Sequence, residues 1–189
     1  GSEMCIRDRY LSHPVFKVIK QHLEDTDDSA FVIGGFVRDL LLDKKSKDID
    51  IVVYGDGLEF AKNIAKTLRV KKVSLFKTYG TAHFKYKDID VEFVSARKES
   101  YSKDSRNPKV SPGTLKDDQY RRDFTINALA INLHPEHFGV LIDPFQGSID
   151  LEKGLIKTPL DPSTTFNDDP LRICLLYTSP SPRDQRGSR

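Results

Sequence analysis

The feature that most constrains the fold is a run of mostly β-branched residues at 49–54 (IDIVVY), which is typical of a buried β-strand. Two aspartates, Asp48 and Asp50, occupy alternate positions at its start. Because residues i and i+2 of a strand project from the same face, both carboxylates point one way while Ile49 points to the core. Two carboxylates on one rigid face repel each other unless a cation joins them, so the pair is a candidate Mg²⁺ site. The alternative is a solvent-facing strand start, since two acids at this spacing are common by chance.

The rest of the chain mixes helical and strand-like periods. We expect helices at 14–24, 36–43, 57–68 and 121–131, an amphipathic helix start near 166–176, and further strands at 30–33, 70–76, 80–86, 88–94 and 139–142. The polar stretch 97–120 has no apolar period and predicts a functional or mobile loop. This order is not the regular βαβ alternation of a Rossmann fold, so the sequence predicts an α+β domain, a small mixed sheet with helices on one side.

Composition places the chain among globular proteins, with 38% hydrophobic and 31% charged residues. No apolar run approaches the ~20 residues that span a bilayer, so we expect no membrane partner. Segments 1–10 and 177–189 have no core-forming pattern, and we expect both to be non-native or disordered tails. Cys5 and Cys174 lie near opposite ends, the histidines show no zinc-like spacing, and free thiols in a cytoplasmic protein are the expectation.

The net charge of +2 does not by itself indicate a nucleic-acid partner. Residues 174–189 contribute three arginines against one aspartate, and residues 1–10 sum to zero, so residues 11–173 are neutral overall (+2 − 2 − 0). Only local clusters can carry that argument. Residues 97–123 hold eight Lys or Arg against five Asp or Glu, an excess that suits a triphosphate or an RNA backbone, although a solvated loop would have the same composition.

Gly34 and Gly35 separate a short strand from a helix. Two glycines there let the backbone approach a ligand closely and leave N–H groups at a positive helix terminus, as phosphate sites require. The alternative is a tight strand–helix turn, because neither common phosphate-loop motif is present. Arg38, one turn into the helix, could fork onto a phosphate or be an ordinary surface residue.

A third carboxylate would complete a metal site, and strand 88–94 offers three acids on one face. Glu92 is the best candidate because it lies mid-strand, where an outward acid has least structural reason to be. Asp88 and Asp90 are interpreted as hairpin acids.

Two more clusters carry candidate nucleotide-binding residues. Arg122 and Asp123 head an apolar segment, where Asp123 could simply cap a helix. Further on, the sequence Asp168-Asp169-Pro170-Leu171-Arg172 could form a polar helix face that hydrogen-bonds a base edge. It could instead form an ordinary i,i+4 salt bridge between Asp168 and Arg172.

In combination these motifs resemble the head domain of class II tRNA nucleotidyltransferases (CCA-adding enzymes) and bacterial poly(A) polymerases, in the DNA polymerase beta superfamily. The resemblance rests on GGFVRDLLL (34–42), DIDI (48–51), RRDFTINALA (121–130) and DDPLR (168–172), and it covers roughly residues 14–173. It implies a polymerase-beta-like head at 11–145, followed at 146–176 by the start of a helical neck.

The resemblance also implies an activity: Mg²⁺-dependent transfer of CMP or AMP from CTP or ATP to the 3′ end of tRNA without a nucleic-acid template. Asp48 and Asp50 would hold the metals, with Glu92 as the third catalytic carboxylate. The nucleotide would contact Gly34, Gly35, Arg38, Arg122, Asp123, Asp169 and Arg172. Asp168 stands where the family has a glutamate, and 97–120 matches a region that helps the switch from C to A addition.

Three readings of the function stay open. The first is CCA addition by a truncated form, in which most of the tRNA-binding surface is absent. Poly(A) polymerase or A-adding activity is the second, since these enzymes share the same motifs. The third is a catalytically weak nucleotide-binding fragment. The sequence leaves the oligomeric state undetermined.

Overall fold

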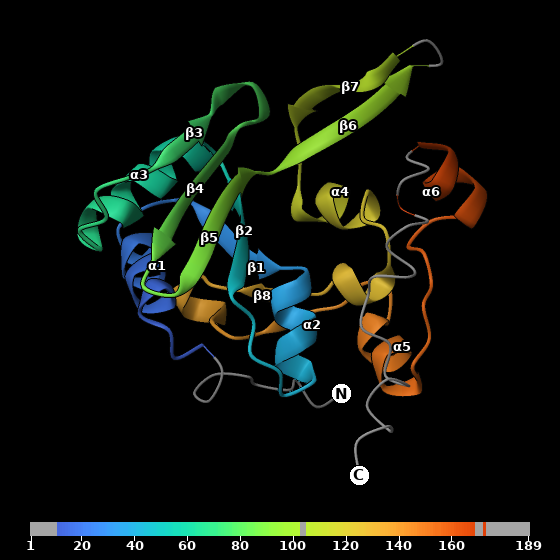
Figure 1. Cartoon of the computed structure of the whole chain (residues 1–189), viewed down its shortest axis with the longest axis horizontal. Helices are drawn as coiled ribbons and strands as arrows, with labels where there is room; N and C mark the ends of the chain where they lie inside the picture. The colour runs from blue at the N-terminus through green and yellow to red at the C-terminus, as the bar shows by residue number, and fades with distance from the viewer. Residues whose placement is uncertain (1–10, 103–104, 169–171, 173–189) are drawn as a thin grey trace.

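The computed structural model describes residues 11–102, 105–168 and 172. Its centre is a seven-stranded sheet in the order β3-β4-β5-β2-β1-β8-β9 (Figure 1). The strands are β1 (Ser29–Ile33), β2 (Asp48–Tyr54), β3 (Ser74–Phe76), β4 (Thr81–Tyr86), β5 (Ile89–Ser95), β8 (Ala130–Asn132) and β9 (Leu141–Ile142). The helices are α1 (Pro14–Glu24), α2 (Gly35–Leu41), α3 (Gly57–Thr67), α4 (Leu115–Tyr120), α5 (Gly147–Lys153) and α6 (Pro162–Asp168). Three 3₁₀ turns are η1 (Lys77–Tyr79), η2 (Thr125–Asn127) and η3 (Pro135–His137).

The expected α+β class and mixed sheet are confirmed. β2 and β5 pair in parallel, and every other neighbouring pair in this sheet is antiparallel. A parallel pair needs a crossover connection, and here α3, β3 and β4 supply it. The crossover returns the chain to the open side of β2, where β5 completes the centre of the sheet.

The main core lies between one face of the sheet and the helices α1, α2 and α3. Ile49, Ile51 and Val53 point into it from β2, and Phe60 of α3 packs against Phe93 of β5. The amphipathic period of α3 brings its apolar stripe onto the sheet, and Asp56 caps its N-terminus by accepting from two backbone amides. Figure 1 shows α1 and α3 together on the left of the view and α4, α5 and α6 on the right.

The opposite face of the sheet carries only a small apolar cluster, formed by Phe31, Ile33, Val52, Ala96, Leu115 and Ala130. α4 covers this cluster and is fixed by a hydrogen bond of 2.5 Å from the backbone amide of Leu115 to the hydroxyl of Tyr54. Elsewhere this face carries mainly polar side chains, Asp48 and Asp50 among them.

The expectation of a loop at 97–120 is wrong. The chain forms a two-stranded ribbon, β6 (Arg97–Ser102) and β7 (Ser105–Pro112), followed by α4. A capping box starts α4: the side chain of Thr114 accepts from the amide of Asp117, whose carboxylate accepts in return from the amide of Thr114. The Thr-x-x-Asp spacing was present in the sequence and is a recognised helix start.

The helix expected at 121–131 is also wrong. η2 and β8 occupy this segment, because Ile131 pairs with Val32 of β1 and so extends the sheet. Leu129, Ile131 and Leu133 alternate into the main core with a period of two, and that alternation marks a strand. Strand 70–76 begins only at Ser74, since the amide of Val70 still donates to the carbonyl of Ala65 and closes the end of α3.

The segment after β9 packs back onto this domain through a buried carboxylate. Asp150 of α5 accepts 2.9 Å bonds from the hydroxyl of Thr125 and from the ammonium of Lys157. α6 begins at Pro162, four residues before the expected start, and most of the expected 166–176 helix lies outside the described residues, as do both tails and the two cysteines. No helix in the described ranges is both long and apolar enough to cross a membrane.

Gly147→Ala tests how tightly α5 is held. A Cβ at Gly147 would stand 2.3 Å from the carbonyl oxygen of Thr125, so α5 and η2 must separate to admit it. We expect a loss of about 1–3 kcal/mol in the free energy of unfolding, measured by urea denaturation. Glu152→Ala, on the exposed side of the same helix, is the control. Equal stability of the two variants would contradict the close packing of α5.

Candidate functional site

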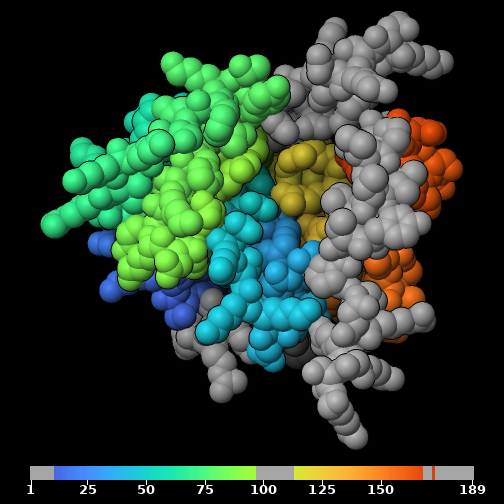
Figure 2. All heavy atoms as spheres, viewed as in Figure 1, coloured from blue at the N-terminus to red at the C-terminus, as the bar shows by residue number. Residues whose placement is uncertain are grey.

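The candidate site is a cavity of about 380 Å³ on the sparsely covered face of the sheet. Asp50 on β2 and Glu92 on β5 are direct cross-strand partners in the parallel pair, so both project from this face and line the cavity. The opposite wall contains Arg121, Arg122, Asp123 and Arg172. In Figure 2 the teal residues of β2 lie in a hollow between the green strands and the ochre segment that follows residue 113. A volume of this size lies within the range of small-ligand sites.

Gly34 lies at the end of the cavity where β1 meets α2. Its φ of 80° belongs to the left-handed region that favours glycine. A Cβ at this position would stand 2.8 Å from Nη1 of Arg122 and 3.5 Å from Oδ2 of Asp50. The missing side chain therefore lets the backbone, a guanidinium and a carboxylate meet at one point. The amide of Gly34 donates to the carbonyl of Leu129 at 3.1 Å, so this N–H group is already used within the protein.

Asp118 is a site residue that the sequence analysis missed. It is fully buried, with 0% exposure, and its carboxylate pairs with both Arg121 and Arg122. Burial alone would raise the pKa of Asp118, but attraction by Arg122 and Arg121 and their hydrogen bonds outweigh it and hold the pKa below its usual value. The i,i+4 spacing of Asp118 and Arg122 was the available signal. The pair fixes the guanidinium of Arg122 between Gly34 and Asp50.

The pKa of Asp50 shifts in the opposite direction, upward. Burial raises the pKa of its carboxyl, Arg122 opposes that shift, and the charges of Asp48 and Asp118 add to it. Asp48 is exposed, two residues earlier on the same face. No group of three or more His, Cys, Asp or Glu side chains within the described residues is arranged to hold a metal. Mg²⁺ is usually held by one or two carboxylates together with water and substrate phosphates, and Asp48 and Asp50 supply that donor set.

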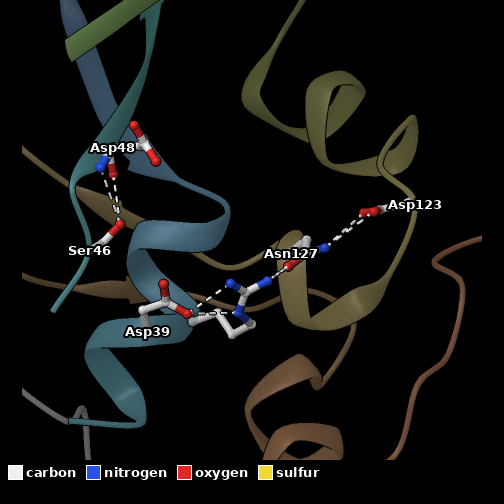
Figure 3. Close-up of polar contacts among 6 residues, drawn as sticks. Asp39, Ser46, Asp48, Asp123 and Asn127 are labelled. Atoms are coloured by element: carbon white, nitrogen blue, oxygen red, sulfur yellow. Dashed lines mark hydrogen bonds and ion pairs between the residues drawn. The ribbon is translucent and has the colours of Figure 1, made fainter. Parts of the chain in front are cut away.

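Arg38 does not line the cavity. Nη1 donates to Asn127 at 2.8 Å, while Nε and Nη2 donate to Asp39. Asn127 in turn donates from its amide to Asp123, so a chain of hydrogen bonds links α2 to the cavity wall (Figure 3). Asp123 also accepts from the amide of Phe124, a local cap of the kind expected. Arg38 is therefore linked to the cavity wall through Asn127 and Asp123, and these bonds use three of the five N–H groups of its guanidinium.

Of the predicted base-reading residues, Arg172 lines the cavity and donates to the carbonyl of Thr165 on α6 at 3.3 Å. Asp169 lies outside the described residues. The cavity therefore gathers Asp50, Glu92, Arg122, Asp123 and Arg172, with Gly34 and Asp48 beside it and Arg38 one hydrogen-bonded step away.

Comparison with known proteins identifies the class to which this domain belongs. Residues 30–157 match the family described as the Poly A polymerase head domain. The fold is also similar to a solved CCA-adding enzyme in an apo form, with a TM-score of 0.77 and 39% identity over 88% of this chain and 39% of that one. A tRNA nucleotidyltransferase complexed with a primer tRNA and an incoming ATP analog matches with a TM-score of 0.72 and 39% identity, over 82% of this chain and 42% of that one. The match therefore places this domain in the class of nucleotidyltransferase head domains.

Sequence relatives are consistent with that class. The A-adding tRNA nucleotidyltransferase of Aquifex aeolicus is 46% identical over 144 residues, 76% of this chain and 17% of that protein. The enzyme of the same name from Halalkalibacterium halodurans is 42% identical over 76% of this chain and 33% of its own length. The mitochondrial CCA tRNA nucleotidyltransferase of Saccharomyces cerevisiae is 37% identical over 77% of this chain and 29% of its own. The chain belongs to the class II tRNA nucleotidyltransferase and poly A polymerase family, and it spans a third or less of these three relatives.

Asp118→Asn tests the role of the buried carboxylate. Removing its charge takes from Arg121 and Arg122 the buried carboxylate that they share, and we expect a loss of about 3 kcal/mol in unfolding free energy at pH 7. Because the folded pKa of Asp118 is lowered, its stabilisation is present above the unfolded value near 3.8 and is lost as pH falls through the folded value. The stability difference between wild type and variant should therefore shrink below that pH. Urea titrations across pH measure it, with exposed Asp27→Asn as control; equal stability at pH 7 would refute the assignment.

Proposed function

We propose that this chain carries the catalytic site of a tRNA nucleotidyltransferase, which moves CMP or AMP from CTP or ATP to the 3′-hydroxyl of tRNA. The observation that carries the proposal is the convergence of Asp50, Glu92 and the Gly34 turn on one cavity. The relatives named for adding A or CCA to tRNA, and the one solved with a primer tRNA and an ATP analog, support it.

In the proposed reaction the oxygen of the 3′-hydroxyl attacks the α-phosphorus, a new P–O bond forms, and the bond to the β-phosphate breaks to release pyrophosphate. Asp48 and Asp50 are the side chains that would hold Mg²⁺, which when bound lowers the pKa of the hydroxyl and neutralises charge on the pyrophosphate. Glu92, across from Asp50, is assigned to take the hydroxyl proton on its carboxylate.

The other site residues hold the nucleotide. Arg122, fixed by Asp118, presents its guanidinium at the Gly34 turn and binds the triphosphate there. Asp123 is oriented through Asn127 and Arg38 and accepts from the sugar hydroxyls. Arg172 donates to the base from the far wall.

A-adding activity is a second candidate, because the 46% and 42% identical relatives both carry that name. Incubating the 189-residue chain with labelled CTP or ATP and tRNAs ending before CCA, after C or after CC separates the candidates. CCA addition requires CTP incorporation, whereas an A-adding enzyme extends only the CC-ended tRNA with ATP.

Asp50→Asn and Asp48→Asn test the catalytic assignment. Each removes a carboxylate proposed to hold the metal, and we expect incorporation to fall about 1,000-fold, as the loss of several kcal/mol of transition-state stabilisation requires. The fold should persist, which circular dichroism and urea denaturation check. Asp88→Asn, at the exposed β4–β5 turn, is the matched control and should keep wild-type activity. Turnover retained by Asp50→Asn would exclude the metal assignment, whereas nucleotide binding with no wild-type turnover would favour a non-catalytic module.

A further inference from the structure

The direction from which the RNA reaches the site follows from the sheet order. In an in-line displacement the attacking hydroxyl and the leaving pyrophosphate lie on opposite sides of the phosphorus. Gly34, where the triphosphate is proposed to bind, lies on the β1 side of β2. β5 and β4 lie on the other side, as Figure 1 shows to the left of β2 with α2 to its right. The strand that ends in the 3′-hydroxyl therefore approaches over β5 and β4.

Two rows of side chains mark this approach. The register aligns Asp50 with Glu92 and Glu92 with His83 in one row. It aligns Asp48 with Asp90 and Asp90 with Lys85 in the other. At a strand spacing of ~4.8 Å, β4 lies about 10 Å from the aspartate pair. Along each row the side chains change from an aspartate on β2 to a basic residue on β4, His83 in one row and Lys85 in the other.

The rows end at a second cavity, of about 560 Å³, at the β4 edge of the sheet. We name it the β4-edge groove. Four cations line it, Arg69, Lys71, Lys72 and Lys85, together with a single acid, Asp90. Asp90 is already held by His83 at 3.0 Å and by Lys85 at 3.6 Å. The formal charge of the lining is thus +3 with His83 neutral (four cations minus one acid).

Three of the four cations have no acidic partner. Arg69, Lys71 and Lys72 are exposed, and no carboxylate in the described part of the chain lies within ion-pairing distance of them. Arg69 sits in the left-handed conformation, φ 56°, in a turn closed by backbone bonds from Arg69 to Lys66 and from Val70 to Ala65. The cations are therefore presented by a turn that is hydrogen-bonded to the end of α3.

Edge protection is the competing account of these lysines. β3 pairs with β4 only as far as His83, so Phe84, Lys85 and Tyr86 present an unpaired strand edge, and lysines commonly guard such edges against pairing with another chain. That account explains Lys85. It gives no reason for three further cations from the α3–β3 connection to line the same cavity without counter-ions, whereas a polyanion does.

We propose that the β4-edge groove binds backbone phosphates of the RNA strand upstream of its reacting 3′ end. This inference rests on the proposed function, because the RNA is the substrate named there. Lys71, Lys72 and Lys85 neutralise phosphates while the 3′-hydroxyl lies at Glu92 and Asp50. The contacts are to phosphate, so they carry no base preference.

The test is binding of a 5′-fluorescent single-stranded RNA 12-mer ending in CC to the 189-residue chain, by anisotropy over a range of KCl concentrations. Each phosphate contact on a single strand contributes about 0.7 to the slope of log K against log salt. In the triple variant Lys71→Gln, Lys72→Gln, Lys85→Gln we expect the slope to fall by about 2. The matched control, Lys17→Gln, Lys62→Gln, Lys153→Gln, removes the same charge from exposed lysines elsewhere and should keep the wild-type slope. ATP binding should be equal in all three proteins.

Each result decides the matter. Equal slopes in the groove variant and the control overturn the proposal, as does an equal loss of ATP binding. Self-association of the groove variant with an unchanged RNA slope overturns it in favour of edge protection. A wild type that incorporates no nucleotide, but whose RNA slope depends on the groove lysines, contradicts the proposed function and leaves the groove standing. A wild type that incorporates nucleotide, but whose RNA slope does not depend on the groove lysines, supports the proposed function and contradicts the groove.

Discussion

The parallel pairing of β2 with β5 is the constraint on which the rest of the site depends. It aligns Asp50 with Glu92 on adjacent strands, so that carboxylates 42 residues apart share one face. An antiparallel hairpin between these strands would need only a short turn, whereas the parallel pair requires the crossover through α3, β3 and β4. α3 of that crossover contributes to the main core on one face of the sheet, and β4 extends the opposite face beyond β5. The connection from β2 to β5 thus contributes both to the core of the domain and to the sheet face that carries the acids.

The carboxylates on this face repel one another, and the positive charge of Arg122 reduces that repulsion. Burial raises the pKa of Asp50, and the charges of Asp48 and Asp118 raise it further, so the ionised form of Asp50 depends on a compensating positive charge. Arg122 provides part of the compensation, and it can do so only because Asp118 holds it in place. A cation held by Asp48 and Asp50, as proposed, would supply further compensation, because a bound metal ion is often the largest local charge in a site. Asp118 therefore acts on the site by fixing the position of a counter-charge.

The sequence predicted what depends on local period and missed what depends on pairing. Val15 and Ile19 at helical spacing predicted α1, and the β-branched run predicted β2 with both aspartates on one face. The helix, the strand and the shared face of the aspartates are confirmed. Residues 121–131 were misread because Phe124 and Ala128, four residues apart, imitate a helical stripe, while β1 offers an edge that pairs with Ile131. The hydrogen bond from Arg38 to Asn127 joins residues 89 positions apart, which no local pattern contains. Asp118 was overlooked because a buried acid and an exposed one look alike in a sequence.

The two faces of the sheet explain how one small domain could hold a nucleotide and leave room for a second substrate, as proposed. One face is fully used by α1, α2 and α3, and on the other α4 covers only the apolar patch around Val52. Among the described residues, the part left uncovered runs from the Gly34 turn across β2 and β5 to β4. A nucleotide and an RNA strand bound as proposed would meet above Asp50. In the proposed arrangement, the order of the strands determines the order of the two substrates. Changing the groove residues should alter affinity for the strand and leave the nucleotide cavity intact, because β5 lies between them.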